Sequence, residues 1–178
     1  DNIDGRYFCV TFDDGLKSCV EGALPILSEK SIPATFYVVT DFMGRSFPPD
    51  DPVARVTFGF NGVNTTLDFL SWEDCRGMIA AGMTIGSHTV SHARLSELSA
   101  GEASLEMERS KTEIERNTSQ PCRHFCAPFG SPDRDFDLSR DGRLAMETGY
   151  STFATGVRGP NRQGGSPFAL RRDHMLAK

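Results

Sequence analysis

The chain has 178 residues, of which 38% are hydrophobic and 10% aromatic, and its formal net charge is −5 at pH 7. This composition is too apolar for a disordered chain, and the negative charge gives no support to a surface that follows nucleic-acid phosphates. No apolar stretch approaches the roughly 20 residues that a membrane-spanning helix needs. We therefore expect one globular domain over residues 1–178 that binds no nucleic acid and has no transmembrane segment.

The cysteines give a weak indication of the compartment. The chain has five of them, and an odd number leaves at least one thiol free or paired with another chain. Their spacing is not that of a zinc site, so we interpret them as buried, unpaired side chains. Unpaired thiols slightly favour the cytoplasm. The chain begins at Asp1 without Met, so we expect a trimmed or processed start, and a periplasmic or secreted location stays open. The sequence does not indicate an oligomeric state.

Two strands and one helix are predicted before residue 41. Segments 6–12 and 32–40 are rich in β-branched and aromatic residues, which is typical of buried strands. Residues 16–30 between them have apolar side chains on one helical face, and Pro25 is expected to bend or interrupt that helix. Segment 41–68 contains repeated proline and glycine breaks, which predict a long loop or excursion with a short hairpin.

Strands and helices alternate after this excursion. Ser71 begins a helix with a capping box in which Asp74 replaces the usual glutamate, and the helix is expected to end at Gly82. The remaining predicted elements are strands at 83–86, 123–127, 150–154 and 168–172, and helices at 95–117 and 139–148. Such alternation predicts parallel strands joined by helical crossovers, in either a barrel or a doubly wound sheet.

Several polar residues follow predicted strands directly. In both architectures ligands bind at the carboxyl ends of the strands, so residues at these positions should meet at one edge of the sheet. The candidate residues at these positions are Asp13, Asp14, His88, His92, Phe129 and His174. Three of the four histidines belong to this set. We therefore expect the functional site at this edge.

The residue types in this set suit a divalent metal. An Asp-Asp-Gly turn and a His-x-x-x-His spacing are each common by chance, but together they offer two imidazoles and a carboxylate. Such a set leaves metal positions open, as hydrolytic metal catalysis requires. One of the two neighbouring carboxylates can then bind the metal while the other acts as a base on a metal-activated water.

Five segments resemble conserved motifs of the polysaccharide deacetylases, the NodB-homology group also called carbohydrate esterase family 4. They are Thr11–Gly15 (TFDDG), Pro33–Phe36 (PATF), Ser87–His92 (SHTVSH), Phe125–Gly130 (FCAPFG) and Leu170–Met175 (LRRDHM). The segments occur in family order and span nearly the whole chain. The resemblance implies a distorted (β/α) barrel with fewer than eight regular strands.

The resemblance also implies an activity. It implies a metal-dependent hydrolase that removes acetyl groups from an N-acetylated, less often O-acetylated, sugar, polysaccharide or glycan precursor by cleaving the C–N bond of a linear amide. The ion is expected to be Zn²⁺, because two imidazoles and one carboxylate suit zinc in a hydrolytic site, and Co²⁺, Ni²⁺ or Mn²⁺ could substitute.

The resemblance assigns a role to each candidate residue. The implied metal ligands are Asp14, His88 and His92. Asp13 would act as the base on the metal-bound water, and His174 would protonate the leaving amine. The backbone N–H of Phe129 would help to hold the oxyanion of the tetrahedral intermediate.

The chain departs from the family pattern in two places. Many members have an arginine that orients the base where this chain has Cys126. Arg172 or Arg123 could replace it, and we favour Arg172. The usual fourth motif, with its Asp and Trp, is not visible. Two alternatives therefore stay open: an amide hydrolase of a non-sugar substrate, such as a cyclic ureide, and a catalytically inactive carbohydrate-binding member.

Overall fold

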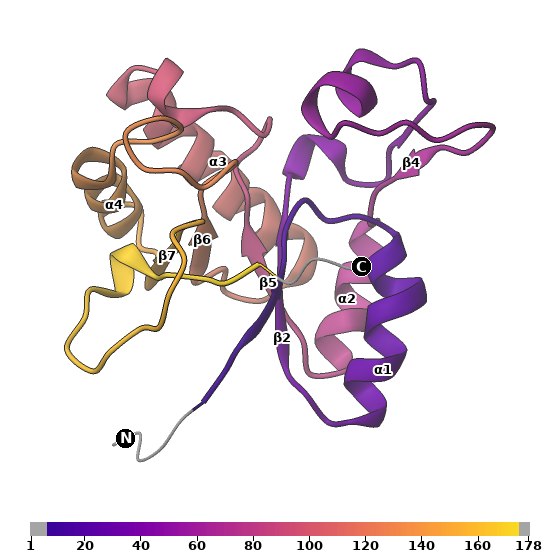
Figure 1. The fold of residues 1–178 in the computed structure, drawn as a ribbon. Helices are drawn as coiled ribbons and strands as arrows, with labels where there is room; N and C mark the ends of the chain where they lie inside the picture. Colours follow the sequence, from indigo (N-terminus) through magenta and orange to yellow (C-terminus); the bar gives the residue numbers. More distant parts are fainter. Residues whose placement is uncertain (1–6, 175–178) are drawn as a thin grey trace.

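A five-stranded parallel sheet forms the centre of the molecule (Figure 1). The structure is a computed structural model and describes residues 7–174. The strands are β1 (Val10–Phe12), β2 (Ala34–Val38), β5 (Thr84–Ser87), β6 (His124–Cys126) and β7 (Thr152–Ala154). Their spatial order is β1-β2-β5-β6-β7, and every neighbouring pair is parallel. The prediction of a distorted (β/α) barrel with fewer than eight regular strands is confirmed.

Four α-helices accompany the sheet in the described part of the chain. They are α1 (Leu24–Glu29), α2 (Trp72–Ala80), α3 (Ala100–Thr118) and α4 (Leu138–Glu147). A π-helical turn, Cys19–Ala23, leads into α1 and puts Pro25 in the first turn of that helix. Proline is tolerated there because the first helical N–H groups have no partner within the helix. The capping box at Ser71 is confirmed, since the side chains of Ser71 and Asp74 each accept the other's backbone N–H.

Three predicted elements need correction. The helix predicted at 95–117 is divided: Leu95–Glu97 forms a 3₁₀ turn, and a second capping box at Ser99 begins α3. The strand predicted at 168–172 is wrong, because Pro167–Ala169 forms a 3₁₀ turn and only Leu170 bridges to the sheet. Proline favours such a turn and has no N–H for a strand ladder. The strand predicted at 6–12 begins at Val10, and its first residue lies outside the described part of the chain.

The excursion after β2 forms a small lobe with its own apolar core. Strands β3 (Ser46–Phe47) and β4 (Leu67–Asp68) pair antiparallel, but a long connection that contains the π-helical turn Val53–Thr57 joins them in place of the short hairpin that was expected. Phe42 and Phe69 are buried in the lobe, and the ring of Phe58 packs against both, at 5.9 and 5.4 Å between ring centroids. In Figure 1 the lobe stands at the upper right, around β4. Its core holds Phe58 beside the carboxyl edge of the sheet.

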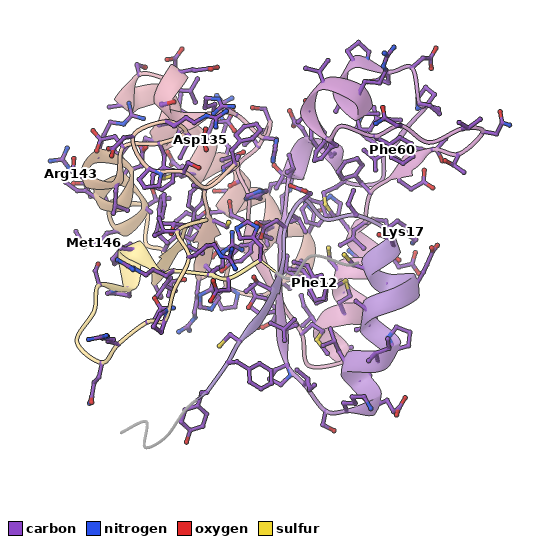
Figure 2. The ribbon with its side chains drawn as sticks, in the orientation of Figure 1. Phe12, Lys17, Phe60, Asp135, Arg143 and Met146 are labelled. Atoms are coloured by element: carbon purple, nitrogen blue, oxygen red, sulfur yellow. The ribbon has the colours of Figure 1, made fainter. Side chains whose placement is uncertain are left out.

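The main core lies between the sheet and the helices. Phe36, Phe125 and Phe153, one from each of three strands, are fully buried. Figure 2 shows Phe12 among the crowded side chains at the centre of the molecule, where its ring stacks on Phe36 at 4.7 Å. All five cysteines are free thiols, four of them buried, while Cys9 is exposed. Within residues 7–174, no helix has both the length and the apolar character that crossing a membrane would require.

Candidate active site

The carboxyl ends of β1 and β5 bring the predicted metal ligands to one edge. After β1 the chain turns sharply, with Asp14 at φ 73° and Gly15 at φ 76°. A side chain at Gly15 would lie 3.2 Å from Val38, so a glycine suits this turn for its conformation and for its small size. His88 follows β5 directly, and an irregular turn leads from it to His92. Both aspartates therefore face the histidine turn.

Asp14, His88 and His92 lie close enough to share one ion. The Oδ1 atom of Asp14 is 3.4 Å from Nε2 of His88 and 3.2 Å from Nε2 of His92. One ligand atom from each of the three residues lies within 4.8 Å of the others. Atoms bound tetrahedrally at the usual zinc distances are roughly 3.3 Å apart. The three residues therefore fit a divalent metal in both chemistry and spacing.

Hydrogen bonding and burial prepare these side chains for ligation. The Nδ1 of His88 lies 2.8 Å from the backbone oxygen of Cys126, and donation there orients the ring so that Nε2 faces Asp14 as the ligand atom. Burial raises the pKa of Asp14, but hydrogen bonds from His88 and His92 outweigh this effect and lower it. Asp14 is thus ionised at neutral pH. Nδ1 of His92 is buried without a hydrogen-bond partner among the described residues.

The two histidines differ in their affinity for a proton. Burial lowers the pKa of His92, which favours the neutral form that binds metals. Burial also lowers the pKa of His88, but the neighbouring Cys126 and Asp14 outweigh it and raise that pKa well above its ordinary value.

Arg172 holds Asp13 beside the metal-ligand set, where Asp13 also lies within 4.8 Å of His88 and Cys126. The Nη1 and Nη2 atoms of Arg172 donate to the two carboxylate oxygens of Asp13 at 2.7 and 2.8 Å. Burial raises the pKa of Asp13, but the hydrogen bonds from Arg172 outweigh burial and lower it. Arg172 also donates from Nη2 to the sulfur of Cys126 at 3.0 Å. Arg123 precedes β6, so it lies at the opposite edge of the sheet.

The turn after β6 presents Phe129 to the metal-ligand set. Phe129 has a left-handed backbone, φ 63°, and its ring meets that of His92 at 4.9 Å. The guanidinium of Arg94 lies over this ring, 4.3 Å from its centroid. A side chain at Gly130 would lie 2.6 Å from the backbone of Gly156, so this close approach requires glycine. The strained turn is thus held on several sides.

All seven predicted site residues line one cavity of about 250 Å³. They are Asp13, Asp14, His88, His92, Phe129, Arg172 and His174. His174 is exposed at the cavity wall. The sequence did not identify Thr57 and Phe58, which also line the cavity. The ring of Phe58 lies 5.2 Å from that of His92, but it belongs to an irregular excursion with no motif to single it out.

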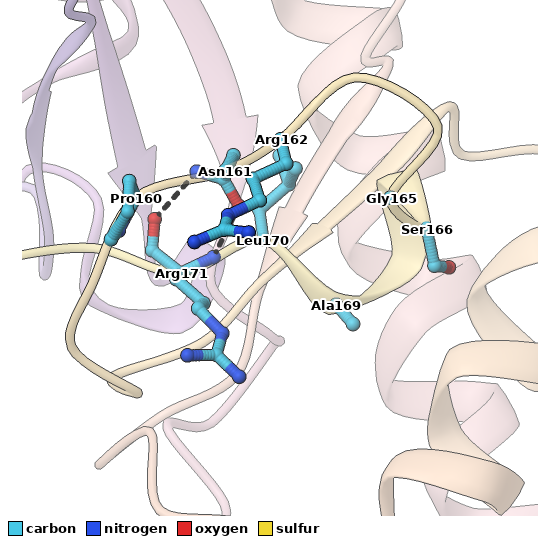
Figure 3. A pocket seen from close by; sticks show the side chains of 8 residues that line it. All are labelled: Pro160, Asn161, Arg162, Gly165, Ser166, Ala169, Leu170 and Arg171. Carbon is cyan, nitrogen blue, oxygen red and sulfur yellow. Dashed lines mark hydrogen bonds between the residues drawn. The ribbon is translucent and has the colours of Figure 1, made fainter.

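A larger cavity of about 480 Å³ lies beside the loop that follows β7 (Figure 3). Its walls include Arg162, Ser166, Leu170 and Arg171. The side chain of Asn161 pairs with the backbone of Arg171, donating to its oxygen and accepting its N–H, both at 2.9 Å. None of the predicted site residues lines this cavity.

The chain matches a family model described as polysaccharide deacetylase over residues 2–149. Among solved structures, it is similar to IcaB from Ammonifex degensii, with a TM-score of 0.77, 24% identity, and coverage of 99% of this chain and 70% of that chain. It is similar to the Streptococcus pyogenes deacetylase PplD in complex with acetate, with a TM-score of 0.74, 22% identity, and coverage of 94% of this chain and 64% of that chain. The BpsB deacetylase domain from Bordetella bronchiseptica has a TM-score of 0.68 and 20% identity, with 91% of this chain and 68% of that chain covered. This chain therefore spans just under two thirds of PplD, and the structural likeness shows a shared fold.

Proposed function

The chain belongs to the polysaccharide deacetylase family, and on this premise we propose that it is a metal-dependent hydrolase that removes acetyl groups from an N-acetylated sugar, polysaccharide or glycan precursor. One observation carries the proposal. Asp14, His88 and His92 offer ligand atoms within 4.8 Å of one another, while Asp13 stands beside them on a separate support. This arrangement separates metal binding from proton transfer, as hydrolysis of an amide requires.

Asp14, His88 and His92 would hold the ion. A divalent ion bound there supplies a Lewis acid that activates water and polarises the acetyl carbonyl. Zn²⁺ suits two imidazoles and one carboxylate, and Co²⁺, Ni²⁺ or Mn²⁺ could replace it. The open side of the ligand set faces the cavity, where a substrate acetyl group can enter.

The remaining residues supply proton transfer and charge stabilisation. Asp13 accepts a proton from the attacking water, because Arg172 holds its carboxylate ionised and oriented. The backbone N–H of Phe129 donates to the oxyanion that forms on the acetyl carbonyl. His174 donates a proton to the departing amine. An amine leaves the tetrahedral intermediate only when it is protonated, so a proton donor at this position suits an N-acetyl substrate.

The test measures metal content and turnover on the same sample. Elemental analysis of the purified protein is expected to show one divalent ion per chain, and acetylated glucosamine oligomers should release acetate. A chelator should abolish this release, and added Zn²⁺ should restore it. Bound metal without acetate release would contradict the deacetylase assignment. Hydrolysis of a cyclic ureide by that protein would then indicate the non-sugar amide hydrolase, and glucosamine-oligomer binding without turnover would indicate the inactive carbohydrate-binding member.

A further inference from the structure

The turn that joins His88 to His92 has a backbone that needs support from outside. Thr89 and His92 both adopt left-handed conformations, with φ of 68° and 62°. Such conformations are unfavourable for residues other than glycine, and most of all for a β-branched threonine. A strained turn persists only where its surroundings hold it. The geometry of the two imidazoles thus depends on contacts made by residues that do not bind the ion.

Glu106, on α3, places its carboxylate against the middle of this turn. Its Oε2 atom accepts the backbone N–H groups of Val90 at 2.8 Å and Ser91 at 3.0 Å. Its Oε1 atom accepts the hydroxyl of Ser91 at 3.0 Å. The two N–H groups belong to residues midway between the histidines. Hydrogen bonds to a carboxylate are stronger than those to a neutral acceptor.

The position of Glu106 is set by the packing of α3 against the end of β5. Met107 and Ser110, on the same helix, are fully buried. The hydroxyl oxygen of Ser110 lies 2.5 Å from that of Ser87, the residue that precedes His88. This contact fixes α3 relative to the start of the turn, so the carboxylate of Glu106 approaches from a rigid support.

The segment after β2 holds the other side of the turn. The N–H of Thr40 donates to the oxygen of Thr89 at 3.3 Å, and the N–H of Asp41 donates to the oxygen of Val90 at 2.9 Å. The carbonyl groups of Thr89 and Val90 are therefore tied to this segment, and the N–H groups of Val90 and Ser91 are tied to α3. Without Glu106, the N–H side of the turn would have to bond to water and would lose its fixed orientation.

We propose that Glu106 is a positioning residue that determines how tightly the chain binds its divalent ion. The inference rests on the metal site proposed above. An ion needs both Nε2 atoms near Asp14 at once, so a turn that samples other conformations must be ordered when the ion binds. That ordering reduces affinity, and residues that support metal ligands typically change affinity by about 10–100-fold.

The experiment measures the dissociation constant for Zn²⁺ by competition with a chromophoric chelator. Wild type is compared with Glu106→Ala, Glu106→Gln and Glu108→Ala. Glu108 is a matched control, because it is exposed on the same helix two residues away. We expect Glu106→Ala to weaken Zn²⁺ binding by about 10–100-fold and Glu108→Ala to bind as wild type does. Glu106→Gln should weaken binding less, because the amide oxygen can still accept the two N–H groups.

The melting temperature of the metal-free proteins separates positioning from a purely structural role. Under the proposal, metal-free Glu106→Ala melts near the wild-type temperature while its Zn²⁺ affinity falls. Wild-type affinity in Glu106→Ala overturns the inference, as does equal weakening in Glu108→Ala. If Glu106→Ala does not fold, Glu106→Gln decides by the same comparison. If wild type binds no Zn²⁺, both the proposed function and this inference are wrong. If wild type and Glu106→Ala bind Zn²⁺ equally tightly, only this inference is wrong.

Discussion

Arg172 and Asp13 are 159 positions apart in the chain, yet each terminal nitrogen of the arginine bonds one carboxylate oxygen of the aspartate. The Nε of Arg172 also donates to the Thr155 oxygen at 2.9 Å, and the backbone N–H of Arg172 donates to the Val157 oxygen at 2.9 Å. The small side chain of Cys126 lies against both partners, with its sulfur 3.6 Å from Oδ2 of Asp13. An arginine from the end of the described chain thus occupies the place beside the proposed base.

Replacing Arg172 should reduce turnover without removing the metal. In Arg172→Ala the Asp13 carboxylate loses its orientation, and a misplaced catalytic group costs on the order of 10²-fold in rate. Arg172→Lys should retain part of the rate, because an ammonium keeps the charge but not the paired geometry. The measurement is kcat for acetate release alongside metal content. Arg171→Ala, which changes the neighbouring residue on the other cavity, is the control. A wild-type kcat in Arg172→Ala would show that the ion pair has no catalytic role.

Asp13→Asn should retain metal and lose most of its activity. An amide cannot accept the proton of the attacking water, and a positioned base contributes about 10²–10⁴-fold to rate. Asp14, not Asp13, lies near Nε2 of both histidines, so metal content should stay at the wild-type level. Acetate release and elemental analysis on one preparation check both parts. An unchanged rate would refute the assignment of Asp13 as the base.

His92→Ala should lose the ion and the stabilisation that the ion provides. A ligand at 100 times its dissociation constant stabilises a folded protein by about 2.7 kcal/mol. Zn²⁺ is therefore expected to raise the melting temperature of wild type and to leave that of His92→Ala nearly unchanged. His124→Ala is the control, because His124 bonds to Thr152 and does not line the cavity. A full zinc-dependent shift in His92→Ala would be incompatible with the proposed ligand set.

Asp74→Asn should destabilise the fold at neutral pH and less so in acid. Burial raises the pKa of Asp74, but hydrogen bonds from Lys17 and Ser71 outweigh burial and lower it below its usual 3.8. The ionised carboxylate therefore stabilises the fold fully above the pKa of the unfolded state, and this contribution is lost as pH falls through the lower folded pKa. Ser71 stays as the N-cap in this variant, so the loss is that of the partly exposed ion pair with Lys17, about 0.5–1 kcal/mol.

Urea unfolding at pH 7 and at pH 3 measures this difference. The free energy of unfolding of Asp74→Asn should lie furthest below that of wild type at pH 7, with a smaller gap at pH 3. Asp50→Asn, at an exposed position, is the matched control. A gap that does not change with pH would mean that the carboxylate charge contributes nothing.

The local features of the fold follow from neighbouring residues and were therefore predictable. The capping box at Ser71 and the strands at β2, β5 and β6 depend on side-chain chemistry within a few positions. The Ser99 capping box was not predicted, because Leu95 and Leu98 suggested a single helix that begins at residue 95. The apolar residues around Phe168 suggested a strand, but Ser166 and Pro167 begin a 3₁₀ turn there. In both cases a capping serine, Ser99 or Ser166, decided where the element begins, although the apolar pattern suggested otherwise.

Local sequence was enough to predict which residues would meet at the carboxyl edge, because parallel strands bring their ends together whatever their detailed packing. It placed Asp14, His88 and His92 there from their positions after β1 and β5, and the family resemblance suggested Arg172 as the partner of the base. The contacts that support these residues came from tertiary packing. Phe58 and Glu106 reach the site through a lobe core and a helix register, and the paired contact of Arg172 with Asp13 depends on a loop crossing. Such contacts depend on the packing of distant segments, which no local pattern encodes.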